Sequence, residues 1–543
     1  MQRATPSSRA VLSVTISLVG SVLVAAAFCW LFLLNADIQL FFTQSDTLYL
    51  PALFSDLHRD LGSFQHWHFP AAPSFFPDML IYGAADAAVS DFRSTLVLFA
   101  ILQLLLLYFG SWLLMRELAP CRFTSFTLCF WSVLVGATLL SYVLGGPLAV
   151  RRFMYVMLPV HHFGAFLIGI YCLALVLAYL RAQRAWLVCL LTALTLATAA
   201  SDLIFVIYFI APMLGLLLIL MAESARFRAA LRLCVILAGA GLVGHLLRRC
   251  IPNVGDLDAY AAVVSRSPWV SLRGLVWLLM GENIGEVLFA AAFVVVPWQQ
   301  MAKRSLRPLT AWLRRRPTAL SPAEMFVLYS VGAAAVIMVV VVYMGLLDTI
   351  RARTRYLMPV NFLPVLWLIF LLTPRLQAYW ERLPSARRVV CRAGATAAAL
   401  LAIGAGLIWG APMSAASALQ APAAVQCFGR TEQAGFADYW MTKPLTMFSD
   451  RRLHVGQLRP DAKLLYWVNN DAWLDRSWAE SPDGPRPSFI YMLGLDPQQI
   501  ENQFGRPTRV VACDGSEIWY YDDAEQLIRR APWQSPQTDF RAF

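Results

Sequence analysis

Charged residues are scarce in this chain. They make up 14% of its 543 residues, whereas hydrophobic residues make up 59% and the mean hydropathy is +0.59. Soluble domains carry a charge at about a quarter of their positions, so this composition excludes an ordinary cytosolic enzyme. Lysine is scarcer still, because only Lys303, Lys443 and Lys463 accompany the arginines. No soluble basic face remains for a nucleic-acid partner, and none is expected.

The charge is divided unevenly along the chain. Residues 1–413 carry 31 basic and 17 acidic residues, or +14, whereas residues 414–543 carry 13 and 16, or −3. The two regions therefore face different solvents. We predict a transmembrane body over residues 1–413 and a polar C-terminal domain over residues 414–543, which has the length of one small domain.

Apolar stretches long enough to cross about 30 Å of hydrocarbon recur through the body. The first of them is longer than a signal-peptide core and lacks a clear cleavage site, so we interpret it as a membrane helix. Together the stretches predict an all-α polytopic membrane protein with about eleven transmembrane helices. The predicted spans are 10–34, 93–115, 124–149, 160–180, 185–201, 203–221, 229–247, 276–297, 324–346, 357–373 and 393–413.

Basic residues assign the two sides of the membrane. Alternate loops and span ends contain 20 of the 31 basic residues of the body but only four acidic residues. The positive-inside rule places those loops in the cytoplasm. With an odd number of spans, the N-terminus is then cytoplasmic and the C-terminal domain is periplasmic or extracellular. We therefore predict a multi-pass protein of the bacterial inner (plasma) membrane.

The predicted outer domain contains two of the ten cysteines, Cys427 and Cys513. In an oxidising compartment they are candidates for a disulfide bond, although two unrelated free thiols are the alternative. Its local signals predict a small α/β module. Asp496 and Pro497 begin a helix that Gly505 ends, and two strands flank a hairpin turn at residues 514–515.

Eleven basic residues remain on the predicted outer side, against the positive-inside bias. A guanidinium is always charged and binds phosphate through two N–H groups, so arginines at a membrane boundary suit a phospholipid or polyprenyl-phosphate head group. The alternative is that these side chains extend toward the lipid phosphates of the interface. The candidates at span ends are Arg151, Arg152, Arg248, Arg353 and Arg355.

The long first outer loop, residues 35–92, carries seven aspartates, including Asp46. An aspartate near the membrane surface can act as a general base toward an acceptor hydroxyl, although capping a helix is the commoner role. Residues 48–61 predict an amphipathic helix in the interface. The histidines of His66-Trp67-His68 lack a third ligand at a recognisable spacing, so no metal site is predicted there.

Polar residues at the outer ends of spans form a third group of candidates. Asp202 lies between two apolar runs with almost no loop, and Glu282 lies near the outer part of a later span. Ionisable groups at membrane depth are functional candidates because their burial is costly. His161 and His162, at the start of the fourth span, can pair with such acids or with a phosphate. Each can instead be a helix cap or a buried polar contact.

This combination resembles the GT-C superfamily of polytopic glycosyltransferases, which includes bacterial aminoarabinose transferases and protein mannosyltransferases. The likeness is carried by Asp46 in a large first outer loop and by the segment Arg353-Thr-Arg355-Tyr356-Leu-Met-Pro359 at the mouth of a late span. About eleven spans and an outer C-terminal domain complete it. The resemblance covers the membrane body and implies a polyprenyl-phosphate-linked sugar as donor, with transfer outside the cytoplasm.

The resemblance also implies residue roles. Asp46 would be the base of an inverting transfer, Arg353 and Arg355 would bind the donor phosphate, and Tyr356 would be a secondary candidate at the acceptor site. The acceptor would be a glycolipid, a polysaccharide or a protein. Thr47 follows Asp46 where the protein mannosyltransferases have a second acid. That departure leaves the acceptor class open, and no cofactor is certain beyond a possible divalent cation.

Other classes stay open. A transporter or flippase for an anionic lipid-linked substrate also needs outer arginines and intramembrane acids, although no inverted repeat is evident. A membrane acyl or phosphoryl transferase would use His161 or His162 as base or nucleophile. A non-catalytic envelope-assembly protein is the third alternative.

Overall fold

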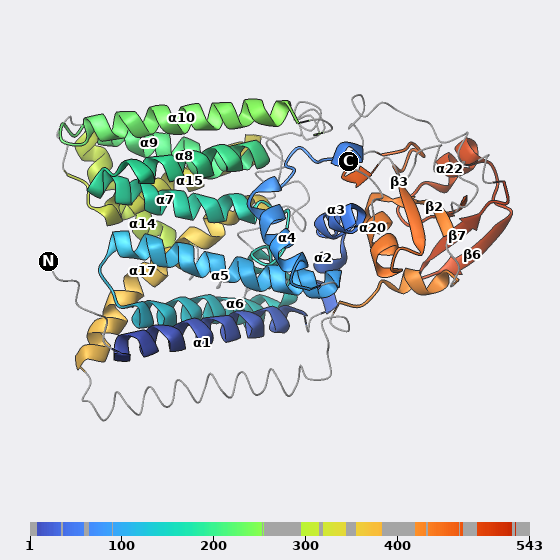
Figure 1. The fold of residues 1–543 in the computed structure, drawn as a ribbon, viewed down its shortest axis with the longest axis horizontal. Coiled ribbons are helices and arrows are strands. Elements are labelled where there is room, and N and C mark those ends of the chain that lie inside the picture. Colours follow the sequence, from blue (N-terminus) through green and yellow to red (C-terminus); the bar gives the residue numbers. More distant parts are fainter. Residues whose placement is uncertain are drawn as a thin grey trace.

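Long helices lie side by side in a bundle, and a sheet domain lies at one end of it (Figure 1). Helix α1 (Ser8–Leu33) starts at the opposite end of the bundle from that domain. The computed structural model describes residues 8–33, 36–58, 64–89, 91–251, 254, 295–313, 319–343, 354–382, 419–429, 433–465, 467–470, 486–523 and 527.

Among the described residues, seven helices are long and apolar enough to cross a membrane. Two shorter apolar helical segments accompany them, so the molecule is a polytopic, mostly helical membrane protein. Of the predicted spans, 393–413 lies outside the described residues and 276–297 almost wholly so; the total of eleven is therefore not confirmed. The seven helices are α1, α5 (Phe92–Leu118), α6 (Phe123–Met154), α7 (Phe163–Ala182), α10 (Phe227–Arg249), α15 (Pro322–Tyr343) and α17 (Met358–Arg382), and the shorter segments are α8 (Ala185–Ser201) and η3 (Val206–Ile210) with α9 (Ala211–Leu220).

Local capping sets the ends of these helices. The Asp91 carboxylate accepts a hydrogen bond from the Ser94 amide at 3.0 Å and begins α5. Helix α7 begins at Phe163 because His162 has a left-handed backbone, with φ of 66°. Gln183, with φ of 48°, ends the same helix and donates its amide to the Tyr179 carbonyl. Helix α14 (Val296–Leu313) packs against α15 and α17. It is an amphipathic helix that carries part of the basic cluster assigned to the cytoplasm.

The first outer loop folds into short elements between the bundle and the sheet domain (Figure 1). Its predicted helix is confirmed as α3 (Tyr49–His58), but the interfacial position is wrong. Six of its ten residues are buried and it packs against the C-terminal domain, because the apolar face that would enter lipid is covered by protein. The other elements are α2 (Ala36–Thr43), η1 (Phe64–His66), β1 (Trp67–His68), η2 (Phe75–Met79) and α4 (Leu80–Asp86).

The C-terminal domain is built on a five-stranded mixed sheet with the order β3-β2-β5-β7-β6. The neighbours of β2 run parallel to it, and the last pair is the predicted hairpin, which turns at Asp514 and Gly515 with φ of 49° and 75°. The strands are β2 (Gln433–Asp438), β3 (Leu453–Leu458), β5 (Pro487–Tyr491), β6 (Arg509–Cys513) and β7 (Ser516–Tyr520), and the helices are η6 (Ala423–Cys427), α20 (Tyr439–Phe448) and the predicted α22 (Pro497–Phe504).

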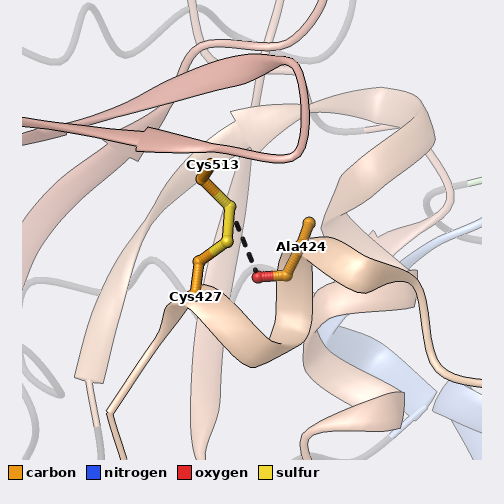
Figure 2. The surroundings of a disulfide bond; sticks show 3 residues. All are labelled: Ala424, Cys427 and Cys513. Atoms are coloured by element: carbon orange, nitrogen blue, oxygen red, sulfur yellow. Dashed lines mark hydrogen bonds between the residues drawn. A yellow bond between two sulfur atoms is a disulfide. The ribbon is translucent and has the colours of Figure 1, made fainter.

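A disulfide bond joins Cys427 to Cys513, whose Cα atoms lie 5.8 Å apart (Figure 2). It connects η6, where the chain enters the domain, to the end of β6 at the edge of the sheet, 86 residues later. The Ala424 carbonyl oxygen lies 3.7 Å from Cys513 Sγ, so the sulfur packs against the turn of η6. The entry segment is thereby held to the hairpin.

Buried polar contacts fasten this domain to the first outer loop. Arg451 Nη1 lies 2.6 Å from Asp56 Oδ1, and the two side chains are 3% and 0% exposed. Arg451 Nη2 also donates to the Ala52 carbonyl at 2.8 Å, and Asn470 donates to Asp56 Oδ2 at 2.8 Å. Strand β4 (Asn469–Asn470) pairs antiparallel with β1 beside them. The position of the domain is therefore defined by hydrogen-bonded charges.

We expect Asp56→Ala to destabilise the protein by about 3–5 kcal/mol, because it leaves the Arg451 guanidinium buried without its charge partner. Thermal unfolding of the detergent-solubilised protein measures the loss. The control is Glu501→Ala, whose partner Arg506 is 89% exposed and whose loss should leave the melting temperature nearly unchanged. Equal melting temperatures for the two variants would contradict the importance of the buried pair.

Candidate functional site

Asp46 and Arg355 form an ion pair at the junction of the bundle, the first outer loop and the C-terminal domain. Arg355 Nη1 lies 2.9 Å from Asp46 Oδ2, although 309 residues separate them in the chain. The side chain of Arg355 is 24% exposed and that of Asp46 is 19% exposed, so both remain accessible. Tyr208 donates its hydroxyl to the Arg355 carbonyl at 3.1 Å and fixes the backbone from which the guanidinium extends.

His161, in the turn between α6 and α7, contacts Arg355 of this ion pair. Its Nδ1 lies 3.4 Å from Arg355 Nη1, and because a guanidinium only donates, Nδ1 accepts. The neutral ring then carries its proton on Nε2, which lies 3.2 Å from Thr47 Oγ1 and 3.3 Å from the side-chain amide of Gln44. Thr47 donates its own proton to the Phe41 carbonyl, so its oxygen is free to accept. Burial first, and then the charge of Arg355, lower the pKa of His161 to about 3 despite the opposing charge of Asp46, so the ring is neutral at pH 7.

The C-terminal domain also reaches Asp46. Tyr439 donates its hydroxyl to Asp46 Oδ1. Tyr439 is the first residue of α20, directly after Asp438, whose side chain caps the helix by accepting from the Met441 amide. Lys443 follows one turn later on the same face, fully buried, with its Nζ 5.0 Å from the centre of the Tyr439 ring and 3.3 Å from Gln457 Oε1.

Charge decides the protonation of the carboxylate. Burial works to raise the pKa of Asp46, but the positive charge of Arg355 and the hydrogen bonds from Tyr439 and Arg355 outweigh it and keep the pKa below its usual value. Burial lowers the pKa of Lys443 to about 7, opposed by the nearby charge of Asp46. Asp46 is therefore an ionised, hydrogen-bonded acceptor at neutral pH.

A second polar group lies beside the first. His162 Nδ1 is 2.7 Å from Asp202 Oδ2, and the His162 ring lies 5.1 Å from the ring of Tyr356. The Arg355 guanidinium carbon in turn lies 5.3 Å from the centre of that tyrosine ring. The two consecutive histidines thus contact different groups. His161 contacts Arg355 directly, whereas His162 packs against Tyr356, whose ring also contacts the Arg355 guanidinium.

A strained turn presents these two histidines. Val160 and His162 have φ of 68° and 66°, a left-handed conformation that a β-branched valine rarely adopts. Asp78 Oδ2 accepts from the Val160 amide at 2.8 Å and holds the turn from the opposite side. Burial, together with the charge of Asp202 and against the Val160 hydrogen bond, raises the pKa of Asp78 to about 7. Gly164 leaves the space that the carboxyl group occupies, since a Cβ atom there would lie 2.1 Å from Asp78 Oδ1.

The structure therefore brings together six of the residues selected from sequence: Asp46, Arg355, His161, His162, Asp202 and Tyr356. Arg353 and Glu282 lie outside the described residues. Arg151 and Arg152 lie in the last turn of α6 without a described side chain, and Arg248 is buried in the last turn of α10. Their phosphate-binding role stays a prediction.

Sequence reasoning missed Tyr439, Lys443 and Asp78. Lys443 carried a signal, because it is one of three lysines in the chain and lies i+4 from a tyrosine in a short helix. Asp78 followed an aromatic-proline stretch and was counted only as one of seven loop aspartates. Trp519 and Tyr521 are buried in the core of the C-terminal domain. Among the described residues no three His, Cys, Asp or Glu side chains are grouped so that they could hold a metal ion.

No protein-family model matches the chain, and no curated protein sequence matches it. Among solved structures, the chain is similar to the crystal structure of ArnT from Cupriavidus metallidurans bound to undecaprenyl phosphate. The TM-score is 0.46 and the sequence identity 13%, over 96% of this chain and 99% of the other.

We expect Gly164→Ala to lower the melting temperature, because the new methyl group must displace Asp78 and release the strained turn. Gly136→Ala is the matched control, since a Cβ at this helical position meets nothing within 4 Å. That substitution should leave stability unchanged or improve it slightly, because alanine favours a helix more than glycine does. Thermal unfolding in detergent measures both, and a Gly164→Ala variant as stable as wild type would contradict the close packing of Asp78.

Proposed function

We propose that this protein is an integral membrane glycosyltransferase of the GT-C type. It transfers a sugar from a polyprenyl-phosphate donor to a hydroxyl group of an extracytoplasmic acceptor, which is a glycolipid, a polysaccharide or a protein. The observation that carries the proposal is the contact between Asp46 and Arg355, at 2.9 Å. These two residues were selected from distant segments for complementary roles, and their proximity supports a shared reaction centre.

Asp46 acts as the general base. Its carboxylate is ionised at neutral pH and 19% exposed, which leaves it reachable by an acceptor hydroxyl. In the reaction the carboxylate takes the hydroxyl proton while the acceptor oxygen forms a bond to the anomeric carbon of the sugar. The bond between that carbon and the phosphate oxygen breaks on the opposite face, so the configuration inverts. Base catalysis of this kind typically contributes about 10²–10⁴-fold.

Arg355 stabilises the leaving group. A guanidinium has five N–H donors, so the side chain can contact Asp46 through Nη1 and still offer donors to a phosphate. The polyprenyl phosphate that leaves is an anion, and a fixed positive charge in a partly water-excluded site lowers the energy of the transition state in which that charge develops. His161 and Tyr356 contact the guanidinium from two sides and limit its reorientation.

The position of the site and the basic loops together give the side of the membrane on which transfer takes place. The site lies at the end of the bundle where the C-terminal domain is seated, and that end faces away from the start of α1 (Figure 1). With the N-terminus in the cytoplasm, as the basic loops indicate, sugar transfer takes place on the periplasmic or extracellular side of the inner membrane. A transporter of a lipid-linked anion is the second candidate, because Arg355 would suit its cargo equally well, but it gives Asp46 no chemical role.

Mass spectrometry of surface glycolipids, polysaccharides and glycoproteins tests the proposal in a deletion strain. We expect one sugar modification to disappear on deletion and to return with the wild-type gene. Asp46→Asn should leave it absent at matched membrane abundance, because an amide cannot take the proton. Arg355→Gln should reduce it strongly for lack of the cation.

Asp86→Asn is the matched control, since Asp86 belongs to the same outer loop but pairs with His58 and does not contact the site. That variant should restore the modification fully. Restoration by Asp46→Asn as complete as by wild type would show that Asp46 is not the base, and the transporter would then be the better hypothesis.

A further inference from the structure

We propose that the C-terminal domain is part of the catalytic centre, with Tyr439 as the positioning residue that fixes the orientation of the Asp46 carboxylate. The inference rests on the proposed function, because it assigns Asp46 as the base. The inference extends that function by giving a catalytic role to the C-terminal domain, which the sequence alone presents as a separate polar module.

The geometry of the carboxylate is the first argument. Tyr439 donates to Oδ1 and Arg355 donates to Oδ2, so the two oxygens are held from two different parts of the chain. A single contact would leave the carboxylate free to rotate about its Cβ–Cγ bond. Two contacts on separate oxygens fix its plane and leave the remaining lone pairs in a defined direction. A base so held needs no reorientation when the acceptor arrives.

The second argument is that several contacts hold the C-terminal domain against the first outer loop. Ser45 donates its hydroxyl to the Tyr439 backbone carbonyl, so consecutive residues of the outer loop bind the same tyrosine. The Asp56–Arg451 pair lies further along the loop and is buried on both sides. Tyr439 itself is the first residue of a capped helix that follows a central strand. The phenol is therefore carried on a rigid element whose position relative to Asp46 is set at several points.

The surrounding charges are the third argument. The groups that face Asp46 are Arg355 from η5 (Thr354–Leu357), His161 from the turn before α7, and Tyr439 and Lys443 from α20. His161 is neutral, so the domain and Arg355 supply the interactions that stabilise the ionised carboxylate. Lys443 Nζ packs over the Tyr439 ring, 5.0 Å from its centre, and holds the ring in place.

The hydrogen bond from Tyr439 determines the direction in which its loss changes the pKa of Asp46. A hydrogen bond donated to the ionised form favours that form, so its loss in Tyr439→Phe raises the pKa of Asp46. The variant carboxyl group is then protonated at a higher pH than in wild type. Phenylalanine keeps the aromatic ring and its packing, so the change is confined to one hydroxyl.

Dicyclohexylcarbodiimide, which reacts with protonated carboxyl groups, reports this directly on the purified full-length protein in detergent. Labelling of the Asp46 peptide is measured by mass spectrometry as a function of pH. We expect the midpoint for Tyr439→Phe to move upward by about one pH unit, a tenfold change in the protonated fraction at a given pH. An unchanged midpoint would overturn the proposal.

Tyr491→Phe is the matched control. Tyr491 lies in β5 of the same domain, is fully buried, and its hydroxyl has no hydrogen-bond partner among the described residues. This variant should keep the wild-type midpoint, and melting temperatures confirm that both variants are folded. A shift of equal size in both would show a general response of the domain rather than an effect of Tyr439, and would also overturn the proposal.

The two proposals fail separately. The labelling needs no substrate, so its outcome does not depend on whether the protein transfers a sugar. In the deletion strain, Tyr439→Phe should restore several-fold less of the modified product than Tyr491→Phe at equal abundance. A shifted midpoint with full product would show that Tyr439 tunes Asp46 without positioning it for the reaction, which contradicts the role inferred here.

Discussion

The buried ion pair between Asp56 and Arg451 is the constraint on which the arrangement of this protein depends. Both side chains are almost fully removed from water, so neither charge can be left alone without a large loss of stability. The pair therefore defines the position of the C-terminal domain on the first outer loop. The Ala52 carbonyl and Asn470 each add a hydrogen bond to the pair and further limit the position of the domain.

The position of the domain has a chemical consequence ten residues earlier in the same loop. Asp46 receives hydrogen bonds from Arg355, at the mouth of α17, and from Tyr439, in the seated domain. Three segments, far apart in the sequence, meet at one carboxylate. Each contributes a different property: the loop supplies an ionised carboxylate, the bundle a permanent positive charge, and the domain a neutral hydrogen-bond donor. The Val160–His162 turn is strained, and Asp78 holds the backbone that presents His161.

Much of the fold could be read in advance because its signals are local. Apolar length marked the helices, Asp496 and Gly505 marked both ends of α22, and Asp514-Gly515 marked the hairpin. The amphipathic pattern of residues 48–61 correctly predicted a helix but not its surroundings. An apolar face has the same sequence pattern whether lipid or protein covers it, and here protein does. Asp46 and Arg355 were found through their residue type and predicted side of the membrane.

The sequence by itself indicated a membrane body and a separate polar C-terminal domain, because composition and periodicity decide which segments can lie in hydrocarbon. It also supplied the carboxylate and the guanidinium as separate candidates. Only the tertiary structure decided that these meet, that Asp202 pairs with His162, and that Tyr439 and Lys443 lie beside Asp46. Such contacts depend on how elements hundreds of residues apart pack together, and packing depends on the shape and burial of all their side chains at once.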